Sequence, residues 1–292
     1  MTAAARFKKL FSKRSPSEIV VHAVVFVIFA GVALSYLYVL FWCIMSSLKT
    51  HVEVVMQPFA LPTVWQWSNY KDVFSMMTVN ENSFLMMVFN SVYFSVIGAF
   101  ISMSTTSLLA YVTTKYKFPG AKLYPIAAFI MITLPIYGTG GAQYKLYFDL
   151  GIVNNYAFIL TSFGGLSIYY LYFSAFYRNL SWSYAEAAEI DGANDFQIYF
   201  LVMLPQSMAL FWSLFIMVWL TQWNDVSMGL LYLRDLPQLS VGVYLFEQNM
   251  MYEARKDILY AGCFLCCIPP LLLFVFCNKI LTSNVSLGGI KE

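Results

Sequence analysis

The sequence predicts an all-α polytopic membrane protein with six transmembrane helices. Hydrophobic residues make up 60% of its 292 residues and charged residues only 11%, whereas about a quarter of the residues of a soluble domain are charged. Each of six long runs contains no Asp, Glu, Lys or Arg and has the roughly 20 residues that a helix needs to cross the hydrocarbon core. These runs are 19–48, 82–114, 123–144, 150–177, 196–224 and 258–278.

The distribution of Lys and Arg predicts the orientation. With a cytoplasmic N-terminus, eleven of the 17 basic residues lie in cytoplasmic segments: Arg6, Lys8, Lys9, Lys13, Arg14, Lys115, Lys117, Lys122, Arg178, Lys279 and Lys291. The other six lie in outer segments: Lys49, Lys71, Lys145, Arg234, Arg255 and Lys256. Because cytoplasmic loops carry the excess of positive charge, we expect both termini and the segment 178–205 in the cytoplasm.

The first part of the chain predicts two long spans. The first, about 19–46, is too long for the apolar core of a signal peptide and lacks a small-residue cleavage site, so we expect it to remain uncleaved. An outer segment, 47–82, leads to the second span, about 84–113. Hydroxyl side chains in that span allow close helix packing and bonds to a neighbouring helix: Ser95, Ser102, Ser104, Thr105, Thr106 and Ser107.

After the short basic loop Lys115–Gly120, a third span is expected at about 122–137. Gly138–Gly141 should form a flexible outer break, and the mixed polar and apolar residues of Gln143–Gly151 suit a short interfacial helix. The fourth span, about 154–177, contains Gly164-Gly165, which indicates either a hinge or close packing.

The fifth and sixth spans are expected at about 206–228 and 258–279. The predicted domains are a basic arm, 1–18, a six-helix membrane domain, 19–280, and a cytoplasmic tail, 281–292.

The sequence lacks the motifs of nucleotide, nucleophile or metal chemistry. It contains no Gly-x-x-x-x-Gly-Lys-[Ser/Thr] loop to cradle phosphates. The five cysteines fall in predicted spans, far in sequence from both His residues, and are expected to be buried free thiols: Cys43, Cys263, Cys266, Cys267 and Cys277. We therefore predict a non-catalytic chain without a metal site or a cofactor of its own.

The segment 178–205 is the most informative part of the chain. Its carboxylates and backbone cannot lie in lipid, where they would lose water without gaining partners. Ser183 is expected to cap a first helix that has Glu186 near its positive end. Gly192 is expected to allow a left-handed turn, and Asp195–Met203 should form a second helix.

This segment has a spaced pattern: Glu186-Ala187-Ala188, three residues that include Asp191, then Gly192-Ala193, an aliphatic Val202, and Leu204-Pro205. The pattern resembles the loop by which the membrane-spanning subunits of bacterial ATP-binding-cassette (ABC) importers dock on their ATPase. A solvated loop that only joins two spans would explain any one of these residues, but not all the offsets together. We call residues 178–205 the coupling loop.

Two further features resemble the carbohydrate-uptake branch of that family, and in particular its maltose-type G subunit. One is Gln222-Trp223-Asn224-Asp225, and the other is a tail that ends in a Gly-Gly-aliphatic-Lys pattern. A departure is Ala209, which stands where a second Pro is often found.

The resemblance implies the type I permease fold and a location in a bacterial plasma membrane. The implied partners are a second permease subunit that completes a heterodimer, two ATPase subunits that bind ATP and Mg, an extracytoplasmic solute-binding protein, and no nucleic acid. The solute is expected to be a carbohydrate, specifically an oligosaccharide. Tail residues implied to contact the ATPases are Gly288, Gly289 and Lys291.

Polar and aromatic side chains inside spans are candidates for the solute pathway, because polar groups are costly in lipid. They are Asn90, Ser91, Tyr93, Ser95, Trp219, Gln222, Trp223, Asn224 and Asp225. Amides and carboxylates suit sugar hydroxyls, and rings suit sugar C–H faces. A helix–helix hydrogen bond or an interfacial ring is an open alternative for each.

Two alternative functions remain open at this stage. One is an ABC permease for another solute, such as a peptide or a polyol. The other is an ATP-independent secondary transporter, which predicts intramembrane charges or inverted repeats. The sequence shows neither clearly, and that class gives no reason for the pattern at Glu186.

Overall fold

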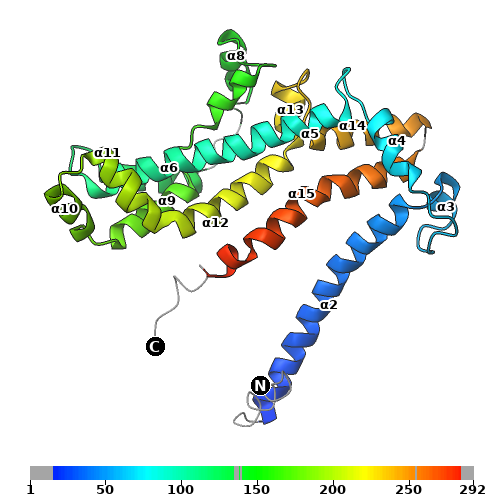
Figure 1. The fold of residues 1–292 in the computed structure, drawn as a ribbon, viewed down its shortest axis with the longest axis horizontal. Helices are drawn as coiled ribbons and strands as arrows, with labels where there is room; N and C mark the ends of the chain where they lie inside the picture. The colour runs from blue at the N-terminus through cyan, green and yellow to red at the C-terminus, as the bar shows by residue number, and fades with distance from the viewer. Residues whose placement is uncertain (1–15, 135–137, 139, 254, 284–292) are drawn as a thin grey trace. The chain divides into compact units, whose positions relative to one another are not determined.

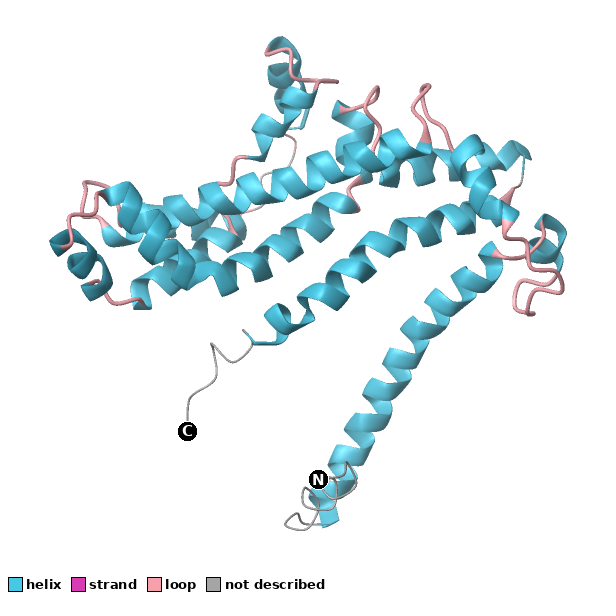
Figure 2. Ribbon diagram, viewed as in Figure 1, coloured by secondary structure: helices cyan, strands magenta, loops and turns pink. Residues whose placement is uncertain are grey.

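The structure, a computed structural model, describes residues 16–134, 138, 140–253 and 255–283. These residues form helices and loops, apart from one isolated bridge between Val79 and Asn82 (Figure 2). The expected all-α class is confirmed. The basic arm up to residue 15 and the tail from residue 284 lie outside the described residues, so their boundaries and contacts stay predictions.

The chain divides into two compact units, the described residues of Met1–Tyr70 with Ala254–Phe264, and those of Lys71–Glu253 with Leu265–Glu292. The first unit holds α2 (Pro16–Ser47), α3 (His51–Met56), and the beginnings of α4 (Ser68–Met76) and α15 (Lys256–Ser283). Buried Lys49 donates to the carbonyls of Gln57 and Pro58, each at 2.9 Å, and so closes the end of α3. Burial lowers the pKa of this ammonium group.

In the second unit, three helices pack side by side (Figure 1). They are α6 (Gly98–Lys115), α9 (Ile168–Asn179) and α12 (Leu204–Trp223). Helix α6 continues α5 (Phe84–Val92) through the π-helical η1 (Tyr93–Ile97), which gives one apolar helix of 32 residues.

Among the described residues, four helices are long and apolar enough to cross a membrane: Ser17–Ser47, Phe84–Lys115, Asp195–Trp223 and Lys256–Cys277. They correspond to the predicted first, second, fifth and sixth spans. The predicted third span contains the shorter α7 (Leu123–Thr133), and the predicted fourth contains the 3-10 helix η2 (Tyr156–Ser162), a break, and α9. Six spans are therefore not established by helix length alone.

The break in the fourth span lies at Gly164-Gly165 and has a packing cause. The Gly164 amide donates to the Thr105 hydroxyl at 2.7 Å, and a β-carbon on Gly164 would overlap the Ser102 carbonyl and the Thr106 hydroxyl. A β-carbon on Gly165 would meet nothing. Close packing is thus confirmed for Gly164.

Two predicted boundaries are wrong. The fifth span ends at Trp223 rather than 228, because the Asp225 carboxylate caps the next helix, α13 (Val226–Tyr232), by accepting from the Met228 amide at 3.0 Å. The expected flexible break at Gly138–Gly141 is shorter, because α8 (Gly140–Asp149) already begins at Gly140 and includes most of the predicted interfacial helix. Helix α14 (Leu239–Glu253) follows α13 and precedes α15.

Candidate functional site

The coupling loop joins α9 to α12 and begins with α10 (Ser183–Ile190). Trp182 already has a helical backbone, and its carbonyl accepts from the Glu186 amide at 3.1 Å. The prediction that Ser183 caps this helix is therefore wrong, because the helix starts before it. The Ser181 hydroxyl accepts from the Ser183 amide at 3.3 Å instead, and Glu186 lies in the first turn as expected.

A glycine turn ends α10. Gly192 has φ +86°, which confirms the predicted left-handed turn. Its amide donates to the Glu189 carbonyl at 3.0 Å, and the next amide, of Ala193, donates to the Ala188 carbonyl at 2.9 Å. This pair of bonds is the Schellman motif, which satisfies carbonyls that a helix end would otherwise leave unpaired. The turn is therefore a defined shape.

The second helical part starts at once. Asn194 caps α11 (Asp195–Gln197) in a reciprocal capping box with Gln197. The π-helical η3 (Ile198–Met203) then leads into α12. Both ends of the turn are thus fixed by side-chain or backbone hydrogen bonds.

Pro205 explains the π-helical register of η3. It has no N–H to donate and cannot continue an α-helical ladder. The Leu204 amide accordingly donates to the Tyr199 carbonyl, five residues back, and the Gln206 side chain donates to the Val202 carbonyl at 3.1 Å. The predicted helix Asp195–Met203 is confirmed, with this local widening at its end.

Side chains next to the end of α6 attach the loop to that helix. The Tyr116 hydroxyl donates to an Asp195 carboxylate oxygen at 2.8 Å, and its ring meets Trp182 edge to face at 6.0 Å. Lys115 donates to the Leu180 carbonyl. Burial, followed by hydrogen bonding with Tyr111 and Asp195, raises the pKa of Tyr116 above its ordinary value.

A buried hydroxyl network lies deeper in the same helices. Ser107 on α6 meets the Tyr177 hydroxyl at 2.8 Å and accepts from the Tyr199 hydroxyl at 3.2 Å. Tyr177 also meets Ser207 at 3.0 Å. All four residues are buried, so the network joins α6, α9, η3 and α12 beneath the accessible surface. The expectation that hydroxyl residues of the second span bond to neighbouring helices is confirmed for Ser107.

The outward surface of the loop presents large apolar side chains beside exposed carboxylates such as Glu186 and Glu189. Ile190 is 87% exposed and Phe196 is 74% exposed. Ala187 is exposed and Ala188 is partly exposed, whereas Ala185 is fully buried and seats α10 on the fold. A hollow of about 240 Å³ lies beside the turn, lined by Asp191, Gly192, Ala193, Gln197, Leu201 and Val202.

The candidate solute-pathway residues on α5 and η1 are bonded within the fold. The Asn90 amide donates to the Pro237 carbonyl at 3.1 Å, and its oxygen accepts from the Tyr156 hydroxyl at 2.9 Å. The Ser95 hydroxyl donates to the Ser91 carbonyl at 2.6 Å. Tyr93 packs edge to face on the Tyr156 ring at 5.1 Å.

The candidates around the end of α12 differ from one another. Trp223 donates to the Cys266 carbonyl at 3.3 Å, and Asn224 donates to the Leu220 carbonyl at 2.8 Å. Asp225 is the helix cap described above. The Trp219 indole nitrogen and the Gln222 side-chain oxygen are buried and have no hydrogen-bond partner among the described residues.

Sequence reasoning missed the tyrosines that hold the loop: Tyr116, Tyr177 and Tyr199. A usable signal was present for Tyr177 and Tyr199, because a Tyr inside an apolar run needs a partner for its hydroxyl. The identity of each partner depends on helix packing and is not readable from the sequence.

The chain was compared with known proteins. No protein-family model matches it. It is 26% identical over 259 residues to the diacetylchitobiose uptake system permease protein NgcG of Streptomyces coelicolor, covering 86% of this chain and 82% of that protein. It is 27% identical over 218 residues to the maltose/maltodextrin transport system permease protein MalG of Salmonella typhimurium, covering 71% and 72%.

Among solved structures, the chain resembles a subunit of a bacterial ABC transporter involved in the import of the acidic polysaccharide alginate. The TM-score is 0.75 at 21% identity, over 91% of this chain and 98% of that chain. This match shows that the chain has the fold of an ABC importer permease. Over most of its length the chain resembles the carbohydrate-uptake permeases of ABC importers, which are multi-pass, non-catalytic components of the bacterial cell membrane.

Proposed function

We propose that this subunit carries an oligosaccharide across the membrane through six spans, with both termini in the cytoplasm. The number of spans is supported by the position of two helix ends. The ends of α6 and α9 lie together, since Lys115 donates to Leu180 and Thr114 meets Ser174 at 3.2 Å. We propose that the chain crosses away and returns between residues 116 and 179, with α7 in the outward crossing and α9 in the return.

The coupling loop is proposed to be the contact with an ATPase subunit. The observation that carries this proposal is the exposure of Ile190 and Phe196 on a loop whose turn is fixed at both ends. Large exposed apolar side chains mark protein interaction surfaces. The residues proposed for the contact are Glu186, Ala187, Ala188, Asp191, Gly192, Ala193, Leu204 and Pro205.

The oligosaccharide class is supported by the relatives, which are named for diacetylchitobiose and for maltose or maltodextrin. For this chain we propose Gln222 and Trp219 as the solute contacts, because their buried polar atoms have no hydrogen-bond partner in the part of the chain that the structure describes. The other candidate residues are proposed to stabilise the fold and not to contact the solute: Asn90, Ser91, Tyr93, Ser95, Trp223, Asn224 and Asp225.

The partners are proposed as a second permease subunit, two ATPases that bind ATP and Mg, and an extracytoplasmic binding protein. Resemblance to the family supports this assembly in general terms. The tail residues Gly288, Gly289 and Lys291 are proposed to reach the ATPases. Deleting Ser286–Glu292 should then leave assembly intact and lower ATP turnover.

One experiment tests both orientation and docking. Ile190→Cys and Val52→Cys, each exposed, are introduced into a chain whose five cysteines are replaced by Ser. We expect an impermeant thiol reagent to label Ile190→Cys only in inside-out vesicles and only before the ATPases bind. Val52→Cys should be labelled only in right-side-out vesicles, with or without ATPases.

The opposite sidedness would overturn the orientation, and labelling of Ile190→Cys that ATPases do not reduce would overturn the docking. Uptake into ATP-free vesicles would instead favour a secondary transporter.

A further inference from the structure

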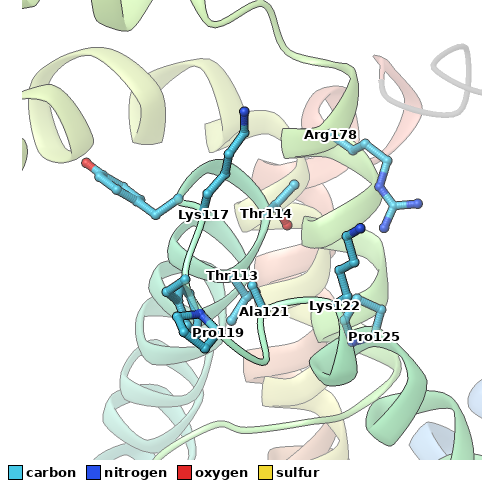
Figure 3. Close-up of a pocket in the computed structure, with 10 residues that line it drawn as sticks. Thr113, Thr114, Lys117, Pro119, Ala121, Lys122, Pro125 and Arg178 are labelled. Carbon is cyan, nitrogen blue, oxygen red and sulfur yellow. The ribbon is translucent and has the colours of Figure 1, made fainter.

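A basic hollow of about 540 Å³ lies beyond the end of α6, and Arg178, the first residue of the coupling loop, is part of its lining (Figure 3). It is formed by the end of α6, the loop to α7, the start of α7, and Arg178 at the end of α9. The lining residues on which the argument depends are Thr113, Thr114, Tyr116, Lys117, Lys122 and Arg178.

The charges of this hollow are all positive. Lys117, Lys122 and Arg178 line it, and no carboxylate does. Within the part of the chain that the structure describes, none of these three cations forms an ion pair. Figure 3 shows Lys122 and Arg178 extending toward the same side of the hollow. Like charges that converge repel one another unless an anion lies between them.

The nearby groups that could neutralise or fill the hollow are already engaged. The Asp195 carboxylate accepts from Tyr116. The hydroxyls of Thr113 and Thr114 meet Tyr170 at 2.8 Å and Ser174 at 3.2 Å, which fixes one wall. The hollow is therefore a concavity with one wall fixed by hydrogen bonds and three cations that form no ion pair among the described residues. An oxyanion such as phosphate suits Arg and Lys donors of this kind.

An apolar surface continues from the hollow along α7. Leu123 is 65% exposed, Phe129 is 63% exposed, and Ile126 between them is also exposed. These side chains belong to a helix within the membrane domain, so lipid chains are their natural neighbours. A cationic hollow next to an exposed apolar helix face complements a phospholipid, which has an anionic headgroup and apolar acyl chains.

We propose that this hollow binds the phosphate headgroup of an anionic phospholipid, with Lys122 and Arg178 as its principal ligands, Lys117 at the rim, and the acyl chains along α7. Basic pockets at the cytoplasmic ends of spans are known sites for such headgroups. The leaflet rests on the orientation proposed above, whereas the binding itself does not. The lipid would fix the loop before α7 next to the helix end that holds the coupling loop.

The test uses the assembled importer in detergent and measures retained lipid by native mass spectrometry, with added phosphatidylglycerol. Lys122→Gln/Arg178→Gln should retain phosphatidylglycerol roughly 30-fold more weakly, because each cation contributes about fivefold near an anionic lipid. The matched control is Lys145→Gln on α8, an exposed lysine that pairs with Asp149 at 3.0 Å and should not change retention. Equal retention by the double variant would overturn the proposal.

Two further measurements distinguish a lipid headgroup from a free phosphate compound, and a lipid site from a protein contact. Inorganic phosphate and glycerol phosphate should not displace the lipid, and displacement by either would assign the hollow to a free phosphate compound. If the double variant keeps its lipid but loses ATPase subunits, the hollow is a protein contact and the lipid proposal is overturned. Retention requires neither solute nor ATP hydrolysis, so failure of the transport proposal would leave this result unchanged.

Discussion

The Tyr116 hydroxyl donates to the Asp195 carboxylate at 2.8 Å and thereby ties the residue after α6 to the first residue of α11. The two residues are 79 positions apart in sequence. Asp195 follows the capped turn at Gly192 directly, so a displacement of the turn is passed to the end of α6 through this bond as well as along the backbone into α12.

Tyr116→Phe should weaken this connection while keeping the ring against Trp182. A hydrogen bond to a charged acceptor contributes about 1.5–3 kcal/mol when buried, and we expect about 1 kcal/mol here because Asp195 is exposed. Hydrogen exchange of residues 183–197 should increase, and less solute should be taken up per ATP hydrolysed. Tyr124→Phe is the control, since its ring packs on Phe118 and its hydroxyl forms no hydrogen bond among the described residues. Equal effects of the two variants would show that the bond is unimportant.

Gly192→Val should deform the turn without a steric clash. A β-carbon at this position meets nothing within 4 Å, so the cost comes from φ +86° alone, about 1–3 kcal/mol for a β-branched residue. We expect normal membrane insertion, weaker retention of ATPase subunits on purification, and loss of uptake. Gly192→Asn should restore most of the activity, because Asn tolerates a left-handed backbone. Normal uptake by the Val variant would contradict the transmission role of the turn.

Gly164 and Gly165 form a matched pair. Gly164→Ala places a methyl group against the Ser102 carbonyl on α6, and backbone cannot move aside as a flexible side chain can. Overpacking of this kind costs about 1–3 kcal/mol, so the thermal unfolding temperature in detergent should fall. Gly165→Ala meets open space and should leave it unchanged. A similar fall for both variants would indicate a hinge rather than close packing.

The sequence predicted features that depend on local composition. Four long apolar helices follow from uncharged runs, and the Gly192 turn follows from a glycine between two polar helical segments. The break in the fourth span could not be bounded, because it depends on how Gly164 packs on Ser102 across 62 residues of sequence. The start of α10 was misplaced because the backbone of Trp182 is already helical, one residue before the expected cap, Ser183. No propensity rule favours a Trp at this position.

The candidate site was predicted unevenly for the same reason. The coupling loop was located from its spacing, since its turn and caps are local. Asn90 and Gln222 look alike in sequence as amides inside apolar runs. Only the fold separates them, because its described residues provide Asn90 with a carbonyl and a tyrosine hydroxyl and leave the Gln222 oxygen unpaired.

Glu53 predicts a pH dependence in the first unit. The Thr63 hydroxyl, followed by the Thr50 backbone amide, donates to this carboxylate and lowers its pKa from 4.5 to about 2. A carboxyl whose folded pKa is depressed stabilises the fold above its unfolded pKa, and that stabilisation is lost as the pH falls through the folded value. Amide protection of Thr50 and Thr63 should therefore persist at pH 5 and decline between about pH 4.5 and 2. Glu53→Gln should show low protection at every pH, and an unchanged pH profile in this variant would contradict the assignment.

Gln222→Ala and Asn90→Ala should separate transport from stability. Gln222→Ala removes a buried oxygen that has no hydrogen-bond partner among the described residues. The substitution should therefore leave stability unchanged, and it should reduce uptake because the proposed solute contact is lost. Asn90 has two partners, at 2.9 Å and 3.1 Å, and its removal leaves a buried carbonyl and a hydroxyl unpaired, which costs about 1–3 kcal/mol. The measurements are uptake at several solute concentrations and thermal unfolding of each purified complex. We expect Gln222→Ala to raise the half-saturating concentration with unchanged unfolding, and Asn90→Ala to lower the unfolding temperature while the surviving complexes keep the wild-type half-saturation. Destabilisation by Gln222→Ala with wild-type half-saturation would instead make Gln222 a packing residue, and the solute pathway would have to be sought elsewhere in the spans.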